Sequence, residues 1–73
     1  MNPETPTVEC YSGNVYAEHP TAIHYQGNRL EVIQVLAQAR QQRGRWFRVR
    51  TQPGEVFDLF YDEVTAEWQV TAL

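Results

Sequence analysis

An alternation of apolar and polar side chains on both sides of one short loop constrains the fold of this chain most. It runs through RWFRVRTQPGEVFDLFYD, residues 45–62. A period of two residues is typical of β-strands with one buried face. The loop between the two runs is Gln52-Pro53-Gly54, and three-residue hairpin loops commonly end in a left-handed glycine. We therefore predict a β-hairpin with Gly54 in the left-handed conformation.

One register aligns the two apolar faces of this hairpin. It places Phe47 opposite Leu59 and Val49 opposite Phe57. A slip of one residue would move every side chain of a strand to the wrong face. The same register sets three pairs on the opposite face: Trp46 with Phe60, Arg48 with Asp58, and Arg50 with Val56. We expect the first set to form the core and Arg48 to have an acidic neighbour.

A second hairpin is indicated by AIHYQGNRLEV, in which two alternating runs flank Gly27-Asn28. Both positions of such a two-residue turn require positive φ, which glycine and asparagine tolerate. With the turn at this place, Ile23 faces Val32 and His24 faces Glu31. The pattern therefore predicts that His24 is a surface partner of Glu31.

Residues 29–42 fit two structures. For a helix, Asn28 begins a capping-box spacing and Gly44 is a C-terminal stop signal. For a strand, the run is rich in β-branched residues, and the hairpin described above uses the residues that would begin the helix. We favour a long, bent strand in which the doublets Val32-Ile33 and Val35-Leu36 mark a bulge where the buried side switches.

The flanking segments add short strands. VEC, residues 8–10, precedes the turn signal Ser12-Gly13-Asn14, and Pro20 then interrupts any regular element. EWQVTAL supplies a last strand with Trp68 and Val70 on one side.

Together these segments predict an all-β fold, a small curved antiparallel meander of about five strands that is either open or closed as an SH3-like barrel. The alternative is an α+β fold with a helix over residues 29–42. A chain of 73 residues has room for one domain, 8–73, after a leader of residues 1–7. The single Cys10 has no intrachain disulfide partner, and neither a secretion signal nor an apolar span is present, so we expect a cytoplasmic protein.

The charges of the chain are unevenly distributed. The net charge is −3, yet residues 29–50 carry six arginines and one glutamate between two acidic segments. Small β-barrels that bind single-stranded nucleic acids combine cations and stacking rings on one face. The candidate nucleic-acid contacts are Arg43, Arg45, Trp46, Arg48 and Arg50. The acidic flanks and the negative total charge favour internal ion pairs instead.

Apolar residues occupy both faces of the predicted sheet. One face is the expected core, whereas Trp46, Val56 and Phe60 lie on the other. A chain of this size has too little material to cover two apolar faces. These three residues are therefore the candidate surface for contact with a larger protein or with a second copy of the chain.

Signatures of catalysis and metal binding are missing from the sequence. Cys10, His19 and His24 have a spacing that matches no familiar zinc site. The acidic residues near the end of the hairpin are better explained as a solvated face than as an acid/base set: Asp58, Asp62 and Glu63. No nucleophile or phosphate-binding motif occurs, so we predict no catalytic residue, cofactor, metal or small-molecule substrate.

The chain resembles a family of small, uncharacterised bacterial domains in three stretches: YSGNVYAEHPTAIHYQGNRLEV, GRWFRVRTQPGEVFDLFYDE and EWQV. Members follow the pattern G-R-x-Y-x-V, then W-F-R-V-x-T-x-x-G-x-x-[FY]-x-L-x-Y-D, then W-x-[VIL], and the match covers roughly residues 10–70. The sequence departs from this pattern at Pro53, where members more often carry an acidic residue. Similar domains also occur at the C-terminus of proteins that resemble Y-family DNA polymerases, so the resemblance implies an accessory role near DNA repair.

Two functions follow as expectations. The first is a non-enzymatic protein-interaction or structural module of a bacterial cytoplasmic protein, with itself or a larger protein as partner. The alternative is a nucleic-acid-binding accessory module for single-stranded DNA or RNA. Nothing in the sequence indicates a membrane partner.

Overall fold

The described residues form one antiparallel sheet of six strands. In the computed structural model these are residues 7–10 and 19–73. The strands are β1 (Thr7–Cys10), β2 (Pro20–Tyr25), β3 (Asn28–Gln41), β4 (Gly44–Thr51), β5 (Val56–Asp62) and β6 (Glu67–Ala72). Their order in the sheet is their order in the chain. The predicted all-β meander is thereby confirmed, with one strand more than the five expected, and the predicted alternative of a helix over residues 29–42 is wrong.

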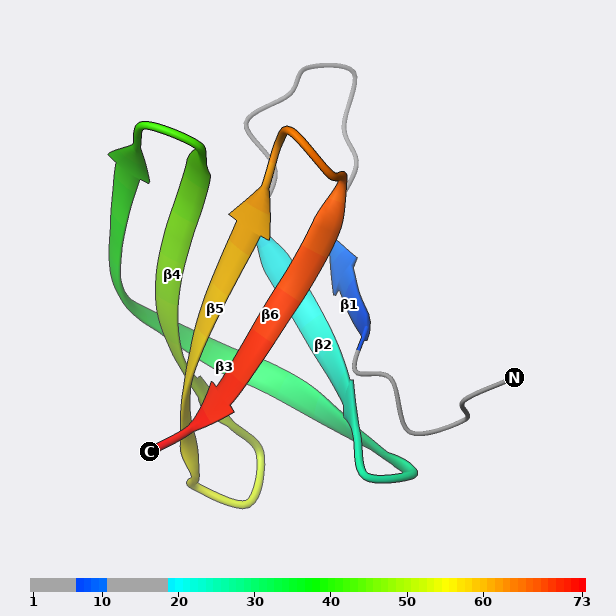
Figure 1. The fold of residues 1–73 in the computed structure, drawn as a ribbon. Coiled ribbons are helices and arrows are strands. Elements are labelled where there is room, and N and C mark those ends of the chain that lie inside the picture. Colours follow the sequence, from blue (N-terminus) through cyan, green and yellow to red (C-terminus); the bar gives the residue numbers. More distant parts are fainter. Residues whose placement is uncertain (1–6, 11–18) are drawn as a thin grey trace.

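The sheet curls into a half-barrel because β3 bends (Figure 1). The first part of β3 pairs with β2, and the rest pairs with β4. Two register shifts interrupt the pairing with β4, between Val32 and Gln34 and between Val35 and Ala37. Each such bulge bends the strand and increases its twist. The two doublets, which predicted one bulge, therefore mark two bulges. On the open side of the half-barrel, β1 and β6 come close but do not pair among the described residues.

The core fills the inside of the half-barrel. Its buried residues come from β2, β4 and β5: Ile23, Phe47, Val49, Phe57 and Leu59. Tyr25 makes an edge contact with Phe57 at 5.2 Å between ring centroids, and Trp68 lies 6.1 Å from Phe47. The register of β4 with β5 is the predicted one at every pair. Gly54, at the end of the predicted loop, has a φ of 102°.

The turn of the first hairpin lies one residue earlier than the sequence predicted. Tyr25 pairs with Asn28, so the turn consists of Gln26 and Gly27, with φ of 52° and 82°. The predicted turn at Gly27-Asn28 is therefore wrong. Each residue now faces a partner two positions away from the predicted one, and such a shift keeps every side chain on the same face. The apolar pattern cannot distinguish these two turns.

Pro20 begins β2 and pairs with Cys10. It starts a strand rather than only interrupting the chain, and the first residue of a strand is a position where a sheet tolerates proline. The predicted turn Ser12-Gly13-Asn14 lies outside the described residues, as do residues 1–6. No helix in the described part of the chain is long and apolar enough to cross a membrane.

Candidate interaction surface

The outer face of β4 and β5, opposite the core, carries most of the residues that the sequence singled out. Its cross-strand pairs are Trp46 with Phe60, Arg48 with Asp58, and Arg50 with Val56. All of these residues are half-buried except Arg50, which is exposed. We call this set of six residues the outer face.

An ion pair occupies the middle of the outer face. Arg48 Nε donates to Asp58 Oδ1 at 2.7 Å and Arg48 Nη2 donates to Oδ2 at 3.1 Å. The guanidinium carbon of Arg48 lies 5.4 Å from the centroid of the Trp46 ring, within range of a cation–π interaction. The hydrogen bond from Arg48 holds the pKa of Asp58 below its ordinary value, with a smaller contribution from Trp46, although burial acts in the opposite direction. The predicted Arg48–Asp58 pairing is confirmed.

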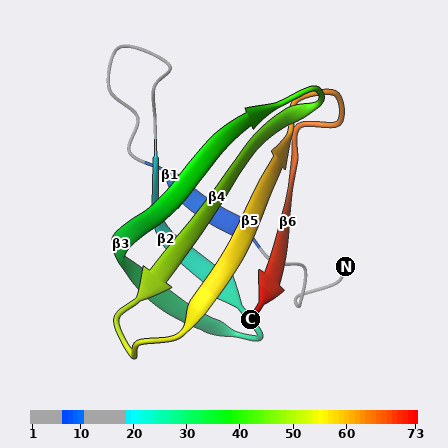
Figure 2. The same cartoon turned by 90° about the vertical axis from the view of Figure 1, so that its left-hand side faces the viewer.

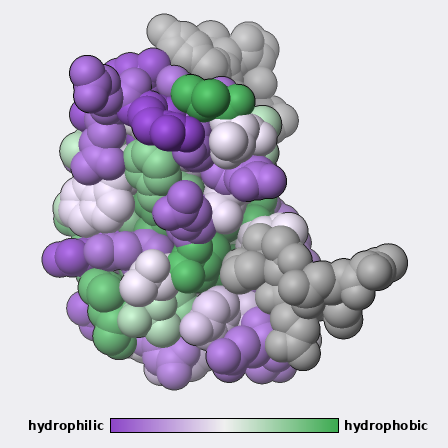
Figure 3. Space-filling model, viewed as in Figure 1, coloured by the Kyte–Doolittle hydropathy of each residue, from purple (hydrophilic) through white to green (hydrophobic). Residues whose placement is uncertain are grey.

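This ion pair divides the apolar residues of the outer face. Trp46 and Phe60 lie side by side at one end, and Val56 lies at the other. The three residues named from the sequence therefore do not form one continuous apolar patch. On the side of the molecule shown in Figure 3, hydrophobic and hydrophilic residues are likewise interleaved. A partner of this face has to match two aromatic rings next to a neutralised charge pair.

A second ion pair joins the β3–β4 turn to the β5–β6 turn. Arg43 Nη2 donates to Asp62 Oδ2 at 2.8 Å. Asp62 Oδ1 accepts the backbone N–H groups of Val64 at 2.9 Å and Thr65 at 3.3 Å. Burial tends to raise the pKa of Asp62, but these N–H donors and Arg43 together hold it below its ordinary value. Asp62 is 6% exposed, so its predicted place on a solvated face is wrong: its carboxylate organises the turn.

The remaining arginines differ in their surroundings. Arg45 lies with its guanidinium carbon 5.5 Å from the centroid of the Phe47 ring. Arg40 is 3.5 Å from Glu63. Arg50 is exposed and forms no ion pair with another residue of the described segments. Two of the candidate nucleic-acid contacts, Arg43 and Arg48, are thus neutralised by carboxylates of the same chain.

Comparison with protein-family models, curated proteins and solved structures finds no match to this chain. The resemblance to small bacterial domains therefore stays a prediction.

The most exposed large apolar residues lie away from the outer face. Ile33 is 54% exposed and Leu36 is 38% exposed, both in β3. Val64 in the β5–β6 turn and Leu73 at the end of the chain are exposed as well. The sequence pattern alone does not assign Ile33 or Leu36 to an exposed surface. The signal was present in the two doublets, because one residue of each doublet has to turn away from the core where the buried side switches.

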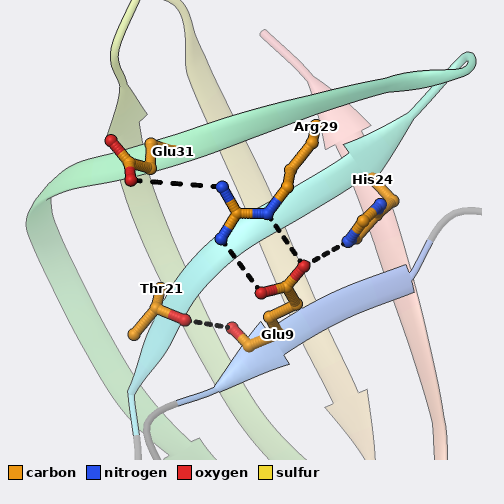
Figure 4. Close-up of polar contacts among 5 residues, drawn as sticks. All are labelled: Glu9, Thr21, His24, Arg29 and Glu31. Atoms are coloured by element: carbon orange, nitrogen blue, oxygen red, sulfur yellow. Dashed lines mark hydrogen bonds and ion pairs between the residues drawn. The ribbon is translucent and has the colours of Figure 1, made fainter.

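A polar cluster joins β1 to the β2–β3 hairpin (Figure 4). The carboxylate of Glu9 accepts hydrogen bonds from Arg29 Nε at 3.0 Å and Arg29 Nη2 at 3.1 Å, and it forms a short contact with His24 Nε2. Thr21 Oγ1 donates to the backbone oxygen of Glu9 at 3.1 Å. His24 thus pairs with Glu9, and its predicted pairing with Glu31 is wrong, because the earlier turn sets His24 opposite Arg29 and β1 brings Glu9 alongside. Arg29 lies 4.0 Å from Glu31.

The hydrogen bonds from Arg29 and His24 lower the pKa of Glu9 from 4.5 to about 2. Because the folded state binds this proton less tightly, the ion pair contributes its stabilisation fully above pH 4.5 and loses it as the pH falls through about 2. We expect Arg29→Gln to raise the pKa of Glu9 toward 4.5 and to flatten the loss of stability in acid. Carbon-13 NMR titration of the side-chain carboxyl measures this. Arg50→Gln is the control that leaves Glu9 unchanged, and a Glu9 pKa near 4.5 in the unsubstituted chain would contradict the ion pairs.

A groove of about 800 Å³ opens at the end of the half-barrel, where the β2–β3 turn, the β4–β5 loop and the end of the chain meet. Tyr25, Leu30, Val56 and Leu73 contribute apolar surface to it, and Arg48 reaches it from the outer face. Within residues 7–10 and 19–73, no three His, Cys, Asp or Glu side chains gather closely enough to hold a metal ion. The groove carries no cluster of charged groups that would define a ligand.

Proposed function

We propose that this chain is a non-enzymatic protein-interaction module whose contact surface is the outer face. The observation that supports this is the pair Trp46 and Phe60. The buried core is built from the opposite face of β4 and β5, so these two rings are not part of it. Aromatic residues next to a fixed arginine are the type that contributes most to binding at protein interfaces.

The ion pairs favour this proposal over nucleic-acid binding. A nucleic-acid surface needs cations that are free to approach phosphates. Arg43 and Arg48 are held by Asp62 and Asp58, and the net charge of the chain is −3. Arg48, stacked on Trp46 and bound to its carboxylate, is arranged as a rigid part of a protein contact.

Truncation of Phe60 tests the proposal. We expect Phe60→Ala to weaken binding of a partner protein, captured by the tagged chain from a bacterial extract, by about tenfold or more, since hot-spot residues contribute that much. Val64→Ala is the matched control, because Val64 is 73% exposed but lies outside the outer face. Quantitative affinity capture at several chain concentrations measures both.

Two results would contradict the proposal. One is equal capture by the unsubstituted chain and by Phe60→Ala. The other is binding to a single-stranded oligonucleotide whose affinity falls with salt at a log–log slope of about −2.8, from roughly −0.7 for each phosphate that one of the four candidate arginines neutralises. The second result would favour the nucleic-acid alternative with its five candidate contacts: Arg43, Arg45, Trp46, Arg48 and Arg50.

A further inference from the structure

The second half of β3 is an open sheet edge. The pairing of β3 with β2 ends at Glu31, whereas its pairing with β4 continues to Gln41. From Ile33 to Gln41 the side of β3 away from β4 therefore faces no strand among the described residues (Figure 2). Such an edge presents a row of backbone N–H and C=O groups that can pair with another strand.

This edge carries few of the side chains that usually block edge pairing. Natural edge strands carry charged residues or proline; residues 37–41 contain no proline and one charged residue, Arg40, which lies 3.5 Å from Glu63 of the same chain. Every residue from Leu36 to Gln41 is exposed. The two bulges interrupt the ladder only up to Ala37, so five residues, 37–41, continue as a regular strand. Five residues is an ordinary strand length.

The other two edges of the sheet are less open. β1 has four residues, and β6 comes close to β1 across the open side of the half-barrel. A strand added to β6 would have to enter beside β1. The regular part of β3 has no such neighbour among the described residues, as Figure 2 shows.

We propose that a second copy of this chain pairs with residues 37–41 of β3 as an antiparallel strand, about a two-fold axis at Ala39. This contact goes beyond the proposed function, because it uses the edge of β3 and not the outer face. An antiparallel edge is complementary to itself under two-fold symmetry. In this register Gln38 lies opposite Arg40 of the partner subunit, and no two like charges face each other. Ala39 pairs with Trp46 within the chain, so the outer faces of both copies become one surface.

The expected dimer is weak. Two five-residue strands bury less area than a standard interface of about 1,600 Å². We therefore expect a dissociation constant on the order of 0.1 mM, in the range between micromolar and millimolar. Sedimentation equilibrium between about 0.01 and 1 mM should show the chain of 8.5 kDa converting into a species of twice that mass.

Charge substitutions at Gln38 test the register. Each Gln38 faces Arg40 of the partner subunit, and the pair occurs twice in a symmetric dimer. We expect Gln38→Glu to tighten the dimer and Gln38→Lys to weaken it, each by roughly threefold to tenfold. Net charge alone predicts the reverse, because Gln38→Glu makes a chain of charge −3 more negative. A dimer that is tighter with Gln38→Glu and weaker with Gln38→Lys therefore indicates that residue 38 lies opposite Arg40 of the partner subunit.

Gln69 in β6 provides matched controls. It is exposed, and Gln69→Glu and Gln69→Lys change the net charge equally at a different edge of the sheet. Three results would overturn the inference. The dissociation constant could change with the Gln69 variants and not with the Gln38 variants, or its changes at Gln38 could follow net charge. The chain could also remain a monomer at every concentration. If the chain is monomeric but Phe60→Ala still abolishes capture of a partner, the β3 pairing fails while the proposed function stands. Circular dichroism confirms that each variant is folded.

Discussion

Replacement of Gly44 by alanine should destabilise this fold by about 3 kcal/mol or more, a value at the upper end for single substitutions. Gly44 begins β4 and is buried between β3 and β5, paired with Gln41 and Asp62. A Cβ at this position would overlap the carbonyl oxygen of Tyr61 and lie 2.8 Å from its carbonyl carbon. These are backbone atoms, so no rotation of a side chain relieves the overlap. β4 and β5 would have to separate where Arg43 and Asp62 join their turns.

The size of this effect is large against the stability of the whole chain. A 73-residue domain has about 4–11 kcal/mol of unfolding free energy. Urea denaturation followed by circular dichroism measures the loss, and we expect a large fraction of Gly44→Ala to be unfolded without denaturant. The control is Gly27→Asn. Gly27 has a φ of 82° with nothing within 4 Å of its Cβ position, and asparagine tolerates that conformation, so this variant should lose less than about 1 kcal/mol. Comparable losses in the two variants would show that the close approach at Gly44 costs little.

Gly44 also illustrates what local sequence patterns leave ambiguous. A glycine at the end of a run with helical spacing is a stop signal for a helix, but Gly44 instead allows the backbone of β5 to approach β4 closely. The sequence shows that residue 44 has no side chain, but only the fold shows that the backbone of Tyr61 occupies the place where a Cβ would lie. The β-branched residues of β3 correctly favoured a strand over a helix.

The β4–β5 hairpin was predictable in register because three signals agree on it. Its two faces have different compositions, the loop ends in a glycine, and one pair, Arg48 with Asp58, has opposite charges. In the β2–β3 hairpin, a turn at Gln26-Gly27 and a turn at Gly27-Asn28 place every side chain on the same face of the sheet. Gly27 belongs to both turns. Local preference favours the wrong turn, because asparagine tolerates positive φ better than most residues, yet it is Gln26 that adopts it here.

The polar clusters that the sequence analysis missed join segments that are distant in the chain. Arg43 reaches Asp62 across 19 residues and Glu9 reaches Arg29 across 20. The first contact requires the β3–β4 and β5–β6 turns to lie together. The second requires β1 to add to β2 after a long connection. Cross-strand pairs within one hairpin follow from register, whereas these contacts follow from how the sheet curls.

Truncation of Phe57 should separate the core from the outer face most clearly. Phe57 is 1% exposed and contacts Tyr25 edge-on, so Phe57→Ala leaves a cavity that the surrounding strands cannot fill. We expect a loss of about 3–5 kcal/mol in the free energy of unfolding. Phe60 is three residues further along the same strand, half-buried on the outer face, and Phe60→Ala should cost only about 1 kcal/mol.

The comparison of these two phenylalanines tests the assignment of faces on which the proposed function depends. Urea denaturation of both variants gives the two free energies, and equal losses would mean that Phe60 is needed for folding as much as Phe57 and is not available to a partner. Leu59→Ala is a second core variant, since Leu59 is fully buried between them, and it should resemble Phe57→Ala. Residues of β5 that face the core determine stability, whereas those on the outer face are expected to determine binding. Phe60→Ala is therefore the variant expected to stay folded while losing the partner. Phe57→Ala loses both through unfolding.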